Sequence, residues 1–453
     1  MSMRRDLDRG SLCWALACVA LLGIAAGTRP ARAQDAKDAA AKDAPAAEKP
    51  AEKPTETPAE KPAEKPAEKP AEQPAEKPAE KPAEKPAEKP AEKPAAPEKP
   101  APDKPAPEAA ADPDAAKKFD ALLASWKAVI KELREIKIKF QTAPDSETEA
   151  LKKQWDAAIA RGEALMPQLL ATGKAAYIAA PNVDLNLTRF LVRFVADSIE
   201  HDDFEPAYEL AELLIANQCE VPEIYQFAGT AAFCVNEFAK AETYFARAQE
   251  AGVLNNETAK KFQSALPDYK QLWPAELETR KKEAEKNDLP RVKLATSKGD
   301  IIVELFENEA PETVGNFVSL VESKFYDGRV FHRVLPNFMA QGGCPIGNGT
   351  GDAGYKIFCE TEKPNHRNHF RGTLSMAHAG KDTGGSQFFL TFVPTPHLNG
   401  RHTAFGRVVE GLDVLAKLQR IDPDAPVKPE PDKIVKAEVI RKRDHKYEPN
   451  KVK

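Results

Sequence analysis

The stretch FHRVLPNFMAQGG at residues 331–343 decides the fold expected for the last third of the chain. It contains short β-prone runs and ends in glycines, and similar runs flank it on both sides. The first two, at 292–296 and 300–305, are separated by Ser-Lys-Gly and predict a hairpin. Residues 311–323 instead show helical spacing. Many short strands with two helices predict a closed, eight-stranded antiparallel barrel over residues 290–445.

Sequence blocks within this region resemble the cyclophilins. They are APETVGNF at 310–317, FHR at 331–333, FMAQGG at 338–343, LSMA at 374–377, GSQFF at 385–389 and HLNGRH at 397–402. The blocks stand in the order of that family and near its spacing, and nothing before Asp288 belongs to the match. The resemblance implies a cyclophilin-type peptidyl-prolyl cis/trans isomerase that acts on proline-containing peptide segments and uses no cofactor.

The chemistry of this activity needs little from the protein. Rotation about an X-Pro bond meets a barrier of about 18–20 kcal/mol, and uncatalysed exchange takes roughly 10–100 s. Exchange in milliseconds requires about 5–7 kcal/mol of transition-state stabilisation. An apolar pocket for the proline ring and a strong donor directed at the twisted amide are sufficient.

The resemblance implies that Arg333 is this donor. Its guanidinium would contact the proline nitrogen and carbonyl and stabilise the twisted amide more than either planar form. The implied proline pocket consists of Phe338, Met339, Phe389, Leu398 and His402. Gln341 and Gln387 would orient the substrate backbone, which would lie along Ala377 and His378.

Two histidines depart from the familiar eukaryotic members of the family. His378 replaces an asparagine, and since that contact is made largely through the backbone, we expect activity to survive. His397, in the expected substrate-binding set, replaces the tryptophan that is the main contact for cyclosporin. We therefore expect weak cyclosporin binding. His366 and His369 lie close together without a cysteine or carboxylate at ligand spacing, so we expect solvated loop histidines and no metal.

Residues 114–286 are rich in alanine, leucine, glutamate and lysine and predict helices. The spacing of small and aromatic residues is similar to that of the tetratricopeptide repeat and recurs one repeat length earlier, which predicts two helical hairpins. The positions are Tyr225, Gly229, Ala241, Phe245 and Ala248, and before them Leu191, Ala207, Ala211 and Leu214. Such a segment either binds a protein partner in a groove or forms a bundle that positions or dimerises the catalytic domain.

The N-terminal quarter of the chain predicts export. Residues 1–33 combine arginines, an apolar run and Ala-Arg-Ala, as a cleaved signal peptide does; a lipoprotein anchor at Cys18 is the less favoured alternative. Residues 34–113 repeat Ala-Glu-Lys-Pro and predict a disordered linker, either a tether of defined reach or a low-complexity tail. No later stretch could span a membrane. Residues 446–453 are expected to be a tail.

The net charge bears on the possible partners, and the positions of the cysteines bear on disulfide formation. A net charge of −5 and a pI near 6.0 argue against nucleic acid as a partner. If Cys219 and Cys234 bracket one helix, they lie about 20 Å apart and remain thiols. Cys344 and Cys359 form either a disulfide or two thiols.

The leading hypothesis is an isomerase, in the periplasm or cell envelope or secreted, that assists the folding of exported proteins. The alternative is a module or scaffold that binds proline peptides and a second partner, with incidental turnover. A third hypothesis is a structural envelope protein in which the linker matters most.

Overall fold

The protein is described from a computed structural model that describes residues 114–448 and 450–452. The expected signal peptide at 1–33 and linker at 34–113 lie outside the described residues. Within the described part, no helix is both long and apolar enough to cross a membrane.

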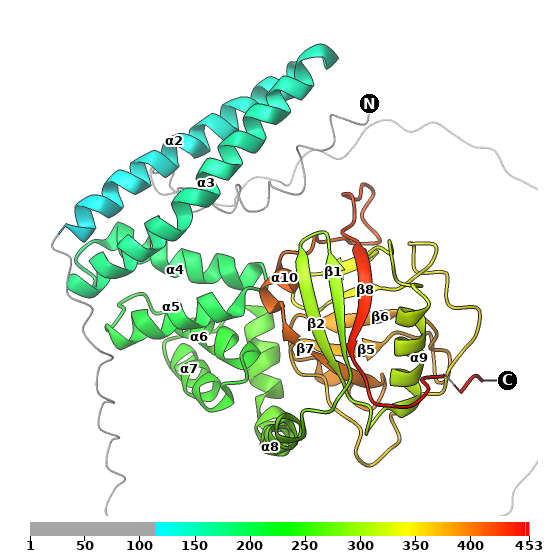
Figure 1. Ribbon diagram of the computed structural model, residues 1–453. Helices are drawn as coiled ribbons and strands as arrows, with labels where there is room; N and C mark the ends of the chain where they lie inside the picture. Colours follow the sequence, from blue (N-terminus) through cyan, green and yellow to red (C-terminus); the bar gives the residue numbers. More distant parts are fainter. Residues whose placement is uncertain (1–113, 449, 453) are drawn as a thin grey trace, which may run out of the picture. The chain divides into compact units, whose positions relative to one another are not determined.

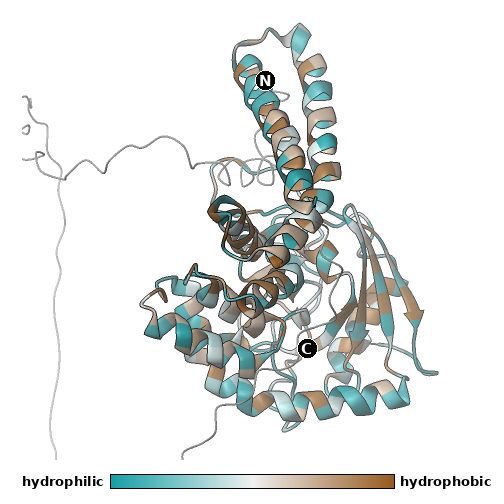
Figure 2. Ribbon diagram, turned by 90° about the vertical axis from the view of Figure 1, so that its left-hand side faces the viewer, coloured by the Kyte–Doolittle hydropathy of each residue, from teal (hydrophilic) through white to brown (hydrophobic). Residues whose placement is uncertain are grey.

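Helices make up the first part of this region. They are α2 (Ala115–Thr142), α3 (Asp145–Ala179), α4 (Leu185–Glu200), α5 (Phe204–Ala216), α6 (Ile224–Cys234), α7 (Phe238–Glu250) and α8 (Glu257–Lys286). Figure 1 shows α2 and α3 as a long antiparallel pair. In Figure 2, apolar and polar residues alternate along this pair, as expected of helices with one buried face.

Helices α4 to α7 form two consecutive hairpins, at the positions where the sequence predicts them. A small residue is required where α6 crosses α7, because a β-carbon on Gly229 would lie 2.6 Å from the ring of Phe245. The assignment of these hairpins to the tetratricopeptide family stays a prediction.

The second part is an eight-stranded antiparallel sheet with the order β3-β4-β6-β5-β7-β2-β1-β8. Its elements are β1 (Arg291–Thr296), β2 (Gly299–Leu305), α9 (Pro311–Glu322), β3 (Arg333–Leu335), β4 (Met339–Gly342), β5 (Thr373–Met376), β6 (Phe388–Thr391), the 3₁₀ helix η2 (Pro396–Leu398), β7 (Ala404–Glu410), α10 (Leu412–Ala416) and β8 (Ile434–Arg441).

The sheet curls into a half-barrel, so the prediction of a closed barrel is wrong. Its two end strands, β3 and β8, are not paired with each other. Strand β3 has only three residues. The start of β8 contacts the segment just before β3 through isolated backbone bonds only. One of these joins the amide of Gly328 to the carbonyl of Ile434 at 2.7 Å. Such isolated bonds do not make a continuous ladder.

The core of the sheet domain lies between the sheet and α9. Phe317 of α9 packs edge-on against Phe388 of β6 and Phe405 of β7, with ring centroids 5.4 and 5.3 Å away. The C-terminal residues also belong to this domain. Tyr447 is buried and donates its hydroxyl to the carboxylate of Glu307, and the backbone amide of Val452 donates to the backbone carbonyl of Lys356.

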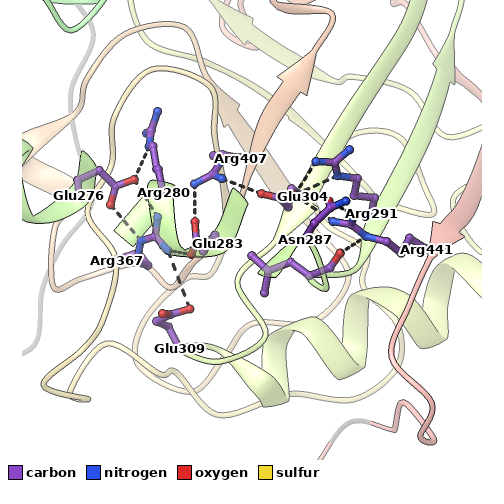
Figure 3. A network of polar contacts seen from close by, with 11 residues as sticks. Glu276, Arg280, Glu283, Asn287, Arg291, Glu304, Glu309, Arg367, Arg407 and Arg441 are labelled. Atoms are coloured by element: carbon purple, nitrogen blue, oxygen red, sulfur yellow. Dashed lines mark hydrogen bonds and ion pairs between the residues drawn. The ribbon is translucent and has the colours of Figure 1, made fainter. Parts of the chain in front are cut away.

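Helix α8 joins the helical part to the sheet domain through buried ion pairs. Glu276 and Glu283 of α8 contact Arg367, and Glu283 also contacts Arg407 of β7 (Figure 3). Nearer the start of α8, Tyr269 donates its hydroxyl to the carbonyl of His369 at 2.7 Å. Cys219, Cys234, Cys344 and Cys359 are all free thiols.

Candidate active site

A cavity of about 420 Å³ opens beside the β3–β4 hairpin and strand β6. Every site residue expected from the sequence lines it except His397: Arg333, Phe338, Met339, Gln341, Ala377, His378, Gln387, Phe389, Leu398 and His402. The sequence did not predict the part of the lining that residues 349–352 contribute, because a glycine-rich loop carries no side-chain pattern that reveals where it folds.

The β3–β4 hairpin places Arg333 next to Gln341, which is its partner in the strand register. The turn of this hairpin contains Asn337 in the left-handed conformation, at φ 54°, which asparagine tolerates better than most residues. The Arg333 guanidinium lies 5.5 Å from the ring centroid of Phe338 and 3.9 Å from the Met339 sulfur. Among the described residues, its N–H groups meet no carboxylate and only the weak acceptor sulfur of Met339, so the remaining N–H groups are available to a ligand in the cavity.

The side-chain amides of Gln341, in β4, and Gln387, just before β6, lie side by side. Gln341 donates from Nε2 to the Oε1 of Gln387 at 2.9 Å. Gln387 donates from its own Nε2 to the carbonyls of Gly349 and Gly351, at 2.9 and 2.8 Å. The amide group of Gln387 therefore fixes the glycine loop, while the Oε1 of Gln341 accepts no bond from the described residues and can receive one from a peptide.

Apolar groups form the deeper wall of the cavity. Met339 and Phe389 are buried, and Phe338 and Leu398 are partly exposed. The ring of Phe389 meets that of His402 edge-on, with centroids 5.5 Å apart. This combination of apolar walls and one free guanidinium suits a proline ring next to a polar amide.

His402 is held as a neutral imidazole. Its Nδ1 lies 2.9 Å from the carbonyl of Met376, so this nitrogen carries the proton. Burial lowers the pKa of His402 below its usual value, and the bond to Met376 opposes this only in part. His378 stacks on it with ring centroids 4.0 Å apart. The carbonyl of Arg401 and the amide of Gly380 contact opposite ring nitrogens of His378 and hold this ring in the stack.

His397 is a surface residue that packs against Phe338, with ring centroids 5.6 Å apart. Burial, followed by the charges of Arg401 and Lys261, lowers its pKa. It therefore contacts a site residue without lining the cavity itself.

The expectation of two solvated loop histidines is wrong for His369, which is fully buried. Its ring nitrogens lie 2.9 Å from the Ser375 hydroxyl and 3.1 Å from the Asn399 side-chain oxygen. Burial lowers its pKa to about 4. His366 is partly exposed and contacts the carbonyl of Lys363. Among the described residues, no group of histidine, cysteine and carboxylate side chains is arranged to hold a metal ion.

Comparison with known proteins identifies the sheet domain. The family described as "Cyclophilin type peptidyl-prolyl cis-trans isomerase/CLD" matches residues 291–439. A peptidyl-prolyl cis-trans isomerase of Helicobacter pylori is 55% identical over 131 residues, which are 28% of this chain and 80% of that protein. Peptidyl-prolyl cis-trans isomerase B of Bacillus subtilis is 57% identical over 119 residues, 26% of this chain and 82% of that protein.

Solved structures of a Cryptosporidium parvum cyclophilin type peptidyl-prolyl cis-trans isomerase also match. One covers 34% of this chain and 99% of its own, at 33% identity and a TM-score of 0.32. Another, in the presence of the dipeptide Ala-Pro, covers 33% of this chain and 98% of its own, at 34% identity and a TM-score of 0.31. The family model and the sequence relatives above show that this chain belongs to the cyclophilin-type peptidyl-prolyl cis-trans isomerases and that its residues 291–439 are the isomerase domain.

Proposed function

We propose that the cavity binds an X-Pro segment with the proline ring against Phe338, Met339, Phe389, Leu398 and His402, and that Arg333 is the catalytic donor. The observation that carries this proposal is the Arg333 guanidinium, which lines an apolar cavity and has no carboxylate partner among the described residues.

Catalysis then follows from differential binding. The apolar walls hold the proline ring while the acyl side of the bond turns. As the amide twists, its nitrogen becomes pyramidal and accepts a hydrogen bond that the planar form cannot accept. A donor that binds only the twisted state lowers the barrier without stabilising the substrate. The free Oε1 of Gln341 accepts a peptide N–H and fixes the segment along Ala377 and His378.

An Arg333→Ala substitution tests this role. We expect kcat/KM for a proline tetrapeptide to fall about 10²–10³-fold, the usual cost of one transition-state donor. Arg189, an exposed arginine of α4, provides the matched control, and its alanine variant keeps full activity. Isomerase activity near that of the wild type in Arg333→Ala would remove Arg333 from the mechanism.

The cellular role that we propose is isomerisation of X-Pro bonds in exported proteins during their folding. The basic and apolar pattern at residues 1–33 supports export, and the Ala-Glu-Lys-Pro repeats support a tether between the envelope and the enzyme. Fractionation of cells that express the full chain tests this: the protein should be in the periplasm, the envelope or the medium. Recovery with the cytoplasmic fraction contradicts it.

A peptide-binding scaffold is the second candidate, favoured by the helical hairpins next to the isomerase domain. In this case the helices bind a protein partner and turnover is incidental. The variant Arg333→Ala separates the two, because a scaffold retains its cellular role when isomerase activity is lost, whereas a folding enzyme does not.

A further inference from the structure

The β3–β4 hairpin that carries Arg333 and Phe338 lies at one end of the sheet. Strand β3 has three residues, and its only strand partner in the sheet order is β4. So short an end strand has few ladder bonds to fix it. Catalytic side chains must be held to within about 0.5 Å. The hairpin therefore needs support from outside the sheet.

Asp202 supplies a contact at the turn of this hairpin. It lies between α4 and α5, in the helical part, and its side chain is 0% exposed. Its Oδ1 accepts a hydrogen bond from the backbone amide of Asn337 at 2.8 Å. Asn337 directly precedes Phe338, the residue whose ring lines the cavity.

The second carboxylate oxygen acts on the other end of the hairpin through Arg420. The Nη2 of Arg420 donates to the Oδ2 of Asp202 at 2.7 Å. The next residue, Ile421, exchanges two backbone hydrogen bonds with Val334, at 2.9 and 2.8 Å. Val334 directly follows Arg333. One oxygen of the buried carboxylate thus contacts the turn of the hairpin, and the other contacts Arg420, whose neighbour Ile421 pairs with β3.

A third contact connects Arg420 to Phe338 through Phe392. The Arg420 guanidinium lies 4.5 Å from the ring centroid of Phe392. The backbone amide of Phe392 donates to the carbonyl of Phe338 at 2.9 Å. Burial raises the pKa of Asp202, whereas Arg420 and the Asn337 amide lower it. These two groups oppose the effect of burial only in part, and both belong to the support of the hairpin.

We propose that Asp202 is a positioning residue of the isomerase: it fixes the β3–β4 hairpin so that Arg333 and Phe338 face the cavity. The helical part is then a functional component of the active site, because it contributes the carboxylate. This inference rests on the roles proposed above for Arg333 and Phe338.

The test uses the full chain with Asp202→Ala. We expect kcat/KM for a proline tetrapeptide to fall roughly ten- to hundredfold, since small misplacements of catalytic groups have effects of this size. Amide hydrogen exchange should become faster in residues 333–339 and stay unchanged in β5. The matched control is Glu205→Gln. Glu205 lies three residues further along and contacts Arg371, which is outside the hairpin, so both readouts should stay as in the wild type.

Two results overturn the proposal: wild-type kcat/KM in folded Asp202→Ala, or faster exchange throughout the chain instead of in the hairpin. If the alanine variant does not fold, Asp202→Asn replaces it. Asparagine keeps an acceptor for the Asn337 amide but loses the charge opposite Arg420, so we expect a smaller loss of about three- to tenfold. Wild-type activity in that variant also overturns the proposal. Hydrogen exchange reports on the hairpin whether or not Arg333 is the catalytic donor, so the two proposals fail separately.

Discussion

Glu276 of α8 accepts two hydrogen bonds from Arg367, at 2.8 and 3.0 Å, in a setting where both side chains are less than a tenth exposed. Arg367 belongs to the sheet domain, and its guanidinium also lies 3.8 Å from the ring centroid of Phe306. The pair lies at one end of the network in Figure 3, and it joins the helical part to the isomerase domain.

Replacing Glu276 with glutamine should lower the free energy of unfolding by about 1–3 kcal/mol, because Arg367 loses one of its buried carboxylate partners and keeps Glu283. Urea denaturation of the full chain, followed by circular dichroism, measures this. Lys282→Ala is the control on the same helix, since its ion pair with Glu278 is exposed and should contribute little. Equal stability of Glu276→Gln and the wild type would show that the pair does not hold the two parts together.

The same pair predicts how stability depends on pH. Burial alone would raise the pKa of Glu276, but the charge and hydrogen bonds of Arg367 outweigh it and hold the pKa below its usual value of 4.5. A carboxylate with a lowered pKa contributes stability above the unfolded value, and this contribution is lost as the pH falls through the folded value. The wild type should therefore lose stability below about pH 4.5 more steeply than Glu276→Gln.

The sequence blocks that resemble the cyclophilins predicted which residues line the cavity better than they predicted the closure of the sheet around it. Arg333 and Gln341 belong to one hairpin, so the register of two adjacent strands is enough to bring them together. The burial of His369 depends on Asn399, a residue from a distant segment, and no local pattern reveals it. The partners of Glu276 could not be predicted either, because helical spacing shows which face of α8 is buried but not which residues pack against that face. Closure of the barrel depends on the length of β3, and a β-prone run in the sequence does not determine how long the strand is.

His402 should set the acid limit of isomerase activity. Burial, and then the neighbouring His378, His397 and Arg401, lower its pKa, so the neutral ring persists down to and below its usual value of 6.5. We expect kcat/KM to be constant from about pH 8 to 6.5 and to fall only below this, when a cation forms in the apolar wall. Isomer exchange measured by NMR at a series of pH values gives the profile. A fall that persists unchanged in His402→Gln would assign the limit to another group.

The ring of His378, which stacks on that of His402, provides a second test of this pH dependence. His378 contributes to the lowering of the His402 pKa, so His378→Asn should raise that pKa and move the acid fall to higher pH. Activity at pH 8 should change little, since the bound peptide is expected to contact the backbone at this position. A shift of the profile to lower pH would contradict the stacking argument.

Cyclosporin should bind weakly, because His397 stands where the family's main contact for this ligand is a tryptophan. The ring of His397 lies 5.6 Å from that of Phe338, at the edge of the cavity wall. His397→Trp should strengthen binding by about tenfold or more, as buried tryptophans do at interfaces. Inhibition of the isomerase by cyclosporin measures both variants. Submicromolar inhibition of the wild type would show that the indole is not required.

The crossing of α6 and α7 should tolerate no side chain at Gly229. A β-carbon there would lie 2.6 Å from the buried ring of Phe245, which has no room to move among its neighbours. Gly229→Ala should therefore lower the free energy of unfolding by about 1–3 kcal/mol despite the better helix propensity of alanine. Gly162 of α3 is the matched control, since its added β-carbon would make an ordinary 3.5 Å contact with Val129. Gly162→Ala should raise stability by about 1 kcal/mol. If both variants are stabilised, the two helices are not packed closely at this point, and the prediction of a repeat-like hairpin loses its main physical support.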